Sequence, residues 1–160
     1  MANSKAENGV DPIIINPIGW VRNGIVENPA EGWGGVVSRI ELRPELAEGL
    51  DGIEGFSHLM VLFWLDRVGP EYRTTLKIHP RGRKDLPEVG VFALHSQSRP
   101  NPIALTVVEL MGKEAPASIV VRGLDAIDGT PVLDIKSYGP SQTRLAEDSI
   151  RVPEWARRLR

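Results

Sequence analysis

Polar side chains of several chemical types follow an apolar run in the middle of the chain. The run Gly90–Leu94 ends at His95, and a serine, a glutamine, a second serine, Arg99 and Asn101 follow within six residues. Two prolines flank the asparagine and fix its backbone, because the proline ring restricts φ. A rigid loop loses little entropy on binding, so these groups could be preset for a ligand. A proline-stiffened surface turn explains the same residues equally well.

A second polar cluster lies between Leu124 and Tyr138. It holds three carboxylates within ten positions, namely Asp125, Asp128 and Asp134. Asp128 and the glycine after it are a strong turn signal. Because side chains alternate along a strand, the following segment places Asp134, Lys136 and Tyr138 on one face, and Leu133 and Ile135 on the other. The simpler explanation is an exposed Asp134–Lys136 pair, worth under about 1 kcal/mol, with Asp128 as a turn former.

Histidines provide little support for a metal site. His58 opens an apolar strand after Gly55-Phe56-Ser57, where a buried histidine with satisfied hydrogen bonds is the commoner explanation. The spacings from His58 to His79 and from His79 to His95 match no helical zinc motif. The chain has no cysteine, which excludes disulfides and thiolate ligands. We therefore expect no metal.

Length and composition indicate one globular domain. The chain has 160 residues, of which 41% are hydrophobic and 25% charged. Its longest apolar run, Leu59–Leu65, is far shorter than the roughly 20 residues of a membrane-spanning helix, and the N-terminus has no signal-peptide pattern. We expect a cytoplasmic protein without a membrane segment. The expected organisation is an unfolded tail (1–11), a β-barrel domain (12–140) and a C-terminal extension (141–160) with a short helix.

Charge is unevenly distributed along the chain. The net charge is −2, but residues 67–99 contain seven Lys and Arg against three Asp and Glu, so 7 − 3 = +4 for that stretch. Such a stretch would attract a phosphate-bearing substrate. A solvated loop of mixed charge is an equally good explanation.

Short segments separated by turns predict a mainly β fold. Thirteen prolines and sixteen glycines interrupt the chain too often for long helices. Alternating or β-branched segments predict strands at 13–22, 36–42, 58–65, 90–94, 105–111, 118–124 and 132–138. Pro44–Leu50 is expected to form a helical turn. Without a strand–helix rhythm or a glycine-rich phosphate loop, a sandwich or barrel is favoured over a nucleotide-binding parallel sheet.

Three separated motifs resemble the TsaA/TrmO family. Members carry G-[IV]-F-A-x-R-S-x-x-R-P-N-P-I-G-[LM], G-[FL]-S-H-[LI] and D-G-T-P-[VL]-[LV]-D-I-K-P-Y segments, and this chain has counterparts at 90–105, 55–59 and 128–138. Chance agreement over three motifs is improbable. The resemblance implies a small single-domain β-barrel that dimerises with itself and binds S-adenosylmethionine near the subunit interface. It also implies N6-methylation of an adenosine beside the anticodon of tRNA.

The resemblance also implies site residues. Those expected to contact S-adenosylmethionine are Asn23, Gly24, Ile25, Ser57, His58, His95, Leu105, Asp125, Ala126, Ile127 and Asp128. A polar framework or substrate contact is expected from Arg99, Asn101, Asp134, Lys136 and Tyr138. An exocyclic amine must lose a proton near the time of methyl transfer. Asp128, Asp125 and His95 are candidates to accept it, and the sequence does not rank them.

Departures from the motif leave the methyl acceptor open. His95 replaces the usual arginine, Gln97 and Ser98 replace a pair that includes an aromatic residue, Ala104 replaces glycine and Ser137 replaces proline. An imidazole is mostly neutral near pH 7, whereas a guanidinium is always charged. The tRNA hypothesis therefore has two alternatives: a methyltransferase acting on a small molecule, and a non-catalytic module that senses S-adenosylmethionine.

Overall fold

The computed structural model describes residues 12–139 and 151–159. The tail expected at 1–11 lies outside the described residues, as does most of the expected extension at 141–160. Within that extension, helix α2 spans Glu154–Arg157. A short helix was expected in this extension, and α2 lies within it.

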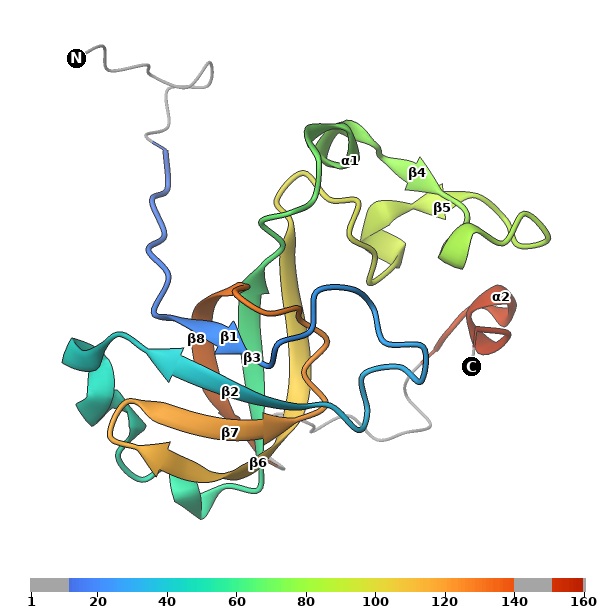
Figure 1. Ribbon diagram of the computed structural model, residues 1–160. Coiled ribbons are helices and arrows are strands. Elements are labelled where there is room, and N and C mark those ends of the chain that lie inside the picture. The colour runs from blue at the N-terminus through green and yellow to red at the C-terminus, as the bar shows by residue number, and fades with distance from the viewer. Residues whose placement is uncertain (1–11, 140–150, 160) are drawn as a thin grey trace, which may run out of the picture.

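Six antiparallel strands close into a barrel, which confirms the predicted fold class. They are β1 (Gly19–Arg22), β2 (Val37–Leu42), β3 (His58–Trp64), β6 (Ile103–Ala115), β7 (Ser118–Arg122) and β8 (Pro131–Tyr138). Their order around the barrel is β1-β2-β7-β6-β3-β8, and β8 pairs back with β1 (Figure 1). Closure pairs the edge strands that an open sheet would leave exposed.

The connection from β3 to β6 carries a small module that stands on one end of the barrel (Figure 1). The module contains α1 (Pro70–Thr74) and a two-stranded sheet of β4 (Lys77–Ile78) and β5 (Val89–Gly90). It also contains two 3-10 helices, Pro80–Gly82 and Val91–Ala93. The other 3-10 helices, Pro44–Leu50 and Ile53–Gly55, lie between β2 and β3, and the first of them confirms the predicted helical turn.

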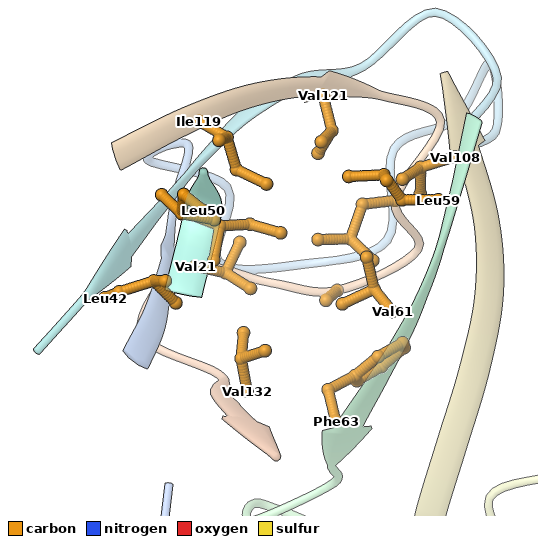
Figure 2. Close-up of a cluster of buried hydrophobic side chains, with 13 residues drawn as sticks. Val21, Leu42, Leu50, Leu59, Val61, Phe63, Val108, Ile119, Val121 and Val132 are labelled. Atoms are coloured by element: carbon orange, nitrogen blue, oxygen red, sulfur yellow. The ribbon is translucent and has the colours of Figure 1, made fainter. Parts of the chain in front are cut away.

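Alternating apolar side chains fill the barrel (Figure 2). Val21, Ile40, Leu59, Phe63 and Val121 are fully buried, each from a strand position that points inward. The outward neighbours are polar or partly exposed, as the period of two requires. Burying a side chain of this size contributes roughly 1.5–3 kcal/mol, so the interior stabilises the scaffold on which the loops are built.

Two strand predictions are wrong in part. Strand β1 begins at Gly19, not at 13, because no backbone pairing extends into the proline-flanked segment Pro12–Pro17. The predicted strand at 90–94 is only β5 followed by a 3-10 turn, closed by a hydrogen bond from the Leu94 N–H to the Val91 carbonyl. Its partner β4 offers just two residues to pair with.

A β-bulge in β8 changes the predicted alternation. Leu62 of β3 lies opposite Asp134, while the next residue, Phe63, lies opposite Val132, which leaves Leu133 without a partner on β3. Val132 is buried and Ile135 packs against the core. The expectation that Leu133 shares a face with Ile135 is therefore wrong, because the extra residue shifts the alternation.

Candidate functional site

Two adjoining hollows lie at the end of the barrel that carries the inserted module. The larger has a volume of about 440 Å³ and the smaller about 300 Å³. Their walls come from the β1–β2 loop, the residues after β3, the segment 95–105 and the β7–β8 connection. Five residues line both hollows: Asn28, Trp33, Leu65, Gln97 and Asp125. The hollows are therefore two chambers with a common wall.

Asp125 is a carboxylate on that common wall. It follows Leu124, whose side chain is fully buried and anchors the connection to the barrel interior. The Asp125 side chain is exposed and accepts a hydrogen bond from the Thr106 hydroxyl of β6. This bond ties the Asp125 carboxylate to β6 at the wall that the two hollows share.

Asp128 is held by backbone donors. Its carboxylate accepts hydrogen bonds from the N–H groups of Gly24 at 3.1 Å and Asn23 at 2.8 Å. These two bonds, together with the nearby Arg22 and Arg67 charges, hold the pKa of Asp128 below its ordinary value against the opposing effect of desolvation. The Arg67 guanidinium also donates to the Asp128 carbonyl at 2.8 Å. Asp128 thus fastens two loops together as a fixed anion.

Asn23 completes this junction. Its amide nitrogen donates to the Ser38 hydroxyl and to the Ala126 carbonyl, both at 2.9 Å, and its amide oxygen accepts from the Ile25 N–H at 3.0 Å. The Asp128 N–H donates to the Ile25 carbonyl at 2.7 Å. The structure thus brings the predicted segments Asn23–Ile25 and Ala126–Asp128 together as one hydrogen-bonded unit, which forms the floor of the smaller hollow through Ala126 and Ile127.

The predicted loop around His95 lines the larger hollow. His95, Gln97, Arg99 and Leu105 all contribute to its wall. The Arg99 guanidinium donates to the carbonyls of Ser96 and Leu94, and so closes the loop upon itself. Arg99 therefore holds the shape of the loop, while His95 is exposed at the chamber wall.

The structure does not bring Ser57 and His58 to the hollows. They form a pair, with the Ser57 hydroxyl 2.9 Å from His58 Nδ1, at the start of β3, whereas the hollows lie beyond its end. The length of β3 separates the two places by about 20 Å. Within one copy of the chain, these two predicted donor contacts lie away from the other nine.

Four of the five predicted framework residues lie outside the two hollows. Asn101 lines a separate hollow with Ile13 and Trp64. Asp134 and Lys136 form an ion pair at 2.6 Å on the outer face of β8, and Tyr138 lies opposite His58. Only Arg99 of the framework set reaches the two-chambered pocket.

Sequence reasoning missed Trp33, Asn28 and Asp66, and counted Arg67 only as a charge. Trp33 stands between Gly32 and Gly34 in a loop of small and polar residues. A large aromatic side chain without an apolar periodic context is the signal that could have found it, since such a residue has no strand face to pack on. Its side chain is half-buried and lines both hollows.

The described residues provide neither a metal cluster nor a membrane helix. Within residues 12–139 and 151–159, no group of three or more His, Cys, Asp or Glu side chains is arranged to hold a metal ion. No helix in the same ranges is long and apolar enough to span a bilayer.

The closed six-stranded barrel, with hollows at one end, places the protein among the small β-barrel proteins. The family model for the tRNA-methyltransferase O N-terminal domain matches residues 25–143, and the chain belongs to this family. The matched residues include both hollows and every strand after β1. This confirms the resemblance to the TsaA/TrmO family.

Archaeal relatives cover most of the chain. A protein of Archaeoglobus fulgidus named "S-adenosyl-L-methionine-binding protein" is 42% identical over 132 residues, which are 80% of this chain and 91% of that protein. A protein of Methanothermobacter thermautotrophicus, named "Probable S-adenosyl-L-methionine-binding protein", is 42% identical over 130 residues, 79% of this chain and 90% of that one.

Solved structures agree in fold. The crystal structure of TrmO from Pseudomonas aeruginosa superimposes with a TM-score of 0.67 at 32% sequence identity, and the match covers 85% of this chain and 60% of that one. A second TrmO crystal structure gives a TM-score of 0.67 at 34% identity, with 85% of this chain and 62% of that one covered. This chain thus spans about three fifths of the solved TrmO chains.

Proposed function

We propose that this protein is an S-adenosylmethionine-dependent methyltransferase that methylates N6 of an adenosine in the anticodon loop of tRNA. The main observation behind this proposal is the pair of hollows with Asp125 on their common wall. A reaction between two bound molecules needs two chambers that meet where the reacting atoms meet. The names of the archaeal relatives and the family description support the choice of donor and acceptor.

The larger hollow fits S-adenosylmethionine by size and chemistry. Phe63 and Leu105 offer apolar wall, while Gln97 and Asp125 offer polar groups that suit ribose hydroxyls and a positive charge. When bound, S-adenosylmethionine supplies a methyl group on a sulfonium. His95 and Arg99 would form the wall beside it, and the backbone of Leu105 would border it.

Asp125 is the best-placed proton acceptor among the three candidates. Asp128 is committed to two backbone donors and has a lowered pKa, which makes it a poor base. His95 lines only the larger hollow. Asp125 borders both, so its carboxylate would accept the hydrogen bond of the acceptor amine. The new N–C bond would form as the bond from the methyl group to sulfur breaks, with its electron pair left on sulfur as an uncharged thioether. The amine N–H bond would break at the same stage, and the proton would pass to Asp125 and then to water.

Dimerisation would account for the position of Ser57 and His58. These residues cannot reach the hollows of their own chain, so a role in donor binding requires a second copy. The outer face of β6 exposes a row of apolar side chains that Glu109 alone interrupts. The row consists of Ile103, Leu105, Val107 and Met111. An apolar surface of this kind favours burial against another protein, and a homodimer is the simplest partner.

The inserted module would hold the phosphates of the tRNA. Lys77, Arg81 and Lys84 are exposed, and none forms an ion pair within the described part of the chain. The Asp85 carboxylate nearby is already paired with Arg83 at 2.7 Å and with Arg158 of the C-terminal segment at 3.4 Å. The module therefore offers exposed cations at the end of the barrel that carries the hollows, which suits a polyanionic substrate.

The direct test is methyl transfer from isotopically labelled S-adenosylmethionine to tRNA, followed by mass spectrometry of the nucleosides. The wild-type protein should produce labelled N6-methylated adenosine, and Asp125→Asn should reduce the rate about 10²- to 10⁴-fold. Asp134→Asn, on the outer face of β8, is the matched control and should retain the rate.

Other outcomes select the alternatives. If the label appeared in a small metabolite but not in tRNA, the methyl acceptor would be a small molecule. Saturable donor binding without transfer to any acceptor would make the chain a binding module and would overturn the enzymatic proposal.

A further inference from the structure

We propose that the inserted module binds an unpaired RNA strand, with the Phe92 and Tyr72 rings as the surfaces on which bases stack. This deepens the proposed function, and the identity of the strand as tRNA rests on that function. The stacking surface itself requires only a single-stranded nucleic acid. It is separate from the two hollows, because neither Phe92 nor Tyr72 lines them.

The module has a small interior in which apolar side chains are buried. Leu86, Val91 and Pro80 lie inside it. His79 Nδ1 lies 2.8 Å from the Leu86 carbonyl oxygen, and the Val91 N–H donates to the Leu76 carbonyl at 3.0 Å. The module can therefore bury apolar groups, so a large apolar side chain that it leaves outside needs another explanation.

Three large side chains of the module are left outside its interior. Phe92 is 77% exposed although it directly follows the buried Val91, Leu76 is 60% exposed and Tyr72 is 46% exposed. Scattered apolar side chains on a surface need no explanation, but a group of large ones marks an interaction site. The exposed group therefore indicates that the module contacts another molecule.

These side chains lie close together along the backbone. The hydrogen bond from Val91 to Leu76 continues the antiparallel pairing of β4 with β5, so Phe92 comes one residue after the partner of Leu76. Tyr72 lies four residues before Leu76, which limits the separation of their Cα atoms to about 14 Å. The exposed rings thus belong to one small region of the module.

The helix that carries Tyr72 is attached to the barrel. The Arg73 guanidinium of α1 lies 5.8 Å from the centre of the Trp64 ring, at the end of β3. A cation over an indole face at this distance is attracted by the ring electrons. The Thr74 hydroxyl donates to the Glu71 carbonyl at 3.1 Å near the end of the same helix. Tyr72 is therefore presented by an anchored element.

Exposed cations accompany the rings. Residues 70–94 contain five Lys and Arg against three Asp and Glu, so 5 − 3 = +2 for the module. Lys77 directly follows Leu76, and Arg81 is exposed with a φ of +52°, in the left-handed region that few residues other than glycine adopt. Backbone strain of this kind persists mainly where a side chain is used. Rings among cations suit the bases and phosphates of a single strand.

The charge also argues against a second copy of the chain as the occupant. In a two-fold contact the same surface of each copy would meet, so the positive module would lie against itself. A base-paired duplex is disfavoured too, because its base faces are covered by their neighbours in the stack. Aromatic side chains recognise RNA through unpaired bases for this reason.

The test measures binding of a single-stranded RNA oligonucleotide that contains 2-aminopurine, without S-adenosylmethionine. Fluorescence anisotropy gives the affinity, and quenching of 2-aminopurine reports stacking. Phe92→Ala should weaken binding at least about tenfold, and Tyr72→Ala should weaken it as well. Phe92→Trp should retain both signals, whereas Phe92→Leu, which keeps an apolar side chain without a ring, should lose them. Phe56→Ala is the matched control, since Phe56 is exposed near the start of β3, at the other end of the barrel.

Contrary results are distinct from failure of the proposed function. Equal affinity of the wild type and Phe92→Ala for the single strand would overturn the stacking role, and so would full binding by Phe92→Leu. Lost self-association of Phe92→Ala in sedimentation, with RNA affinity unchanged, would make the surface a contact between copies and would also overturn it. Absence of methyl transfer to tRNA would contradict the proposed function alone, while ring-dependent binding of the strand would still support the surface.

Discussion

The barrel and the module inserted between β3 and β6 differ in the interactions that stabilise them. In the barrel, Val21, Ile40 and Val61 are fully buried, and strands up to thirteen residues long pair with two neighbours each. In the inserted module the strands β4 and β5 have two residues each, and Tyr72, Leu76 and many charged side chains are exposed. Apolar burial stabilises the barrel throughout, whereas the inserted module buries only a few apolar side chains, Leu86 and Val91 among them, and depends more on individual polar contacts.

This difference separates stability from function. A loop that is held by side-chain hydrogen bonds, such as the Arg99 contacts to Ser96 and Leu94, can be changed while the core stays intact. The same loops carry the residues that line both hollows. Changes in the barrel should therefore alter unfolding, whereas changes in the rim should alter binding and catalysis with smaller effects on unfolding.

The largest effect on stability is expected from Ile40→Ala. The side chain is fully buried in β2, so its removal leaves a cavity and should lower the free energy of unfolding by about 2–5 kcal/mol. Val37→Ala on the same strand is the control, because Val37 is 47% exposed, and should cost much less. Chemical denaturation of both variants measures the difference. Equal decreases would contradict a scaffold stabilised by its interior.

Asp128→Asn should have an intermediate effect, because this rim residue joins two loops to the barrel end. An amide accepts the Asn23 and Gly24 N–H groups less strongly than a carboxylate does, so we expect a decrease of about 1–3 kcal/mol in unfolding free energy. Asp125→Asn is the matched control, since its exposed carboxylate should leave stability nearly unchanged. Denaturation midpoints compare the two, and the opposite ranking would contradict the roles assigned to them.

The pH dependence of stability tests the same junction. The folded pKa of Asp128 is lowered, so this group contributes stability at pH values above its unfolded pKa of about 3.9 and loses that contribution as the pH falls through the folded pKa. Thermal unfolding temperatures between about pH 5 and pH 2 should therefore fall more steeply for the wild type than for Asp128→Asn. If the unfolding temperatures of the two proteins fell in parallel with pH, the Asp128 carboxylate would not be stabilised by the Asn23 and Gly24 N–H groups.

The smallest effect on unfolding is expected in the inserted module. Arg81→Gln and Lys84→Gln remove exposed cations, so the unfolding free energy should change by no more than about 0.5 kcal/mol. The affinity for tRNA should fall, and its dependence on salt should flatten by about one unit of slope for each phosphate that is no longer neutralised. Lys136→Gln, on the outer face of β8, is the control for general charge removal. If all three substitutions lowered the affinity for tRNA equally, the module would not be part of the tRNA-binding surface.

Much of the fold could be predicted because its signals are local. Alternation in 36–42 and the apolar run of β3 reflect the period-two requirement of a barrel strand. The bulge at Leu133 could not be predicted, since it depends on how β8 pairs with β3 across the barrel. The segment 90–94 was misassigned because its apolar residues have no long partner strand to pair with.

Some of the predicted site residues come together in the structure, because their motifs are neighbours in space. The segments Asn23–Ile25 and Ala126–Asp128 meet through hydrogen bonds within a single copy of the chain. Ser57 and His58 did not converge with them, because the geometry of β3 sets about 20 Å between its two ends. Trp33 was overlooked because a single aromatic residue in a loop carries no periodic signal, and only the closed barrel brings it to the common wall.

The most direct test is calorimetric titration of the purified protein with S-adenosylmethionine, with a His95→Arg variant that restores the usual family residue. We predict saturable binding at one site per subunit by the wild-type protein, with an affinity altered by the variant because His95 lines the larger hollow. Absence of binding by both proteins would mean that the barrel is retained without its donor site, and would contradict the methyltransferase proposal.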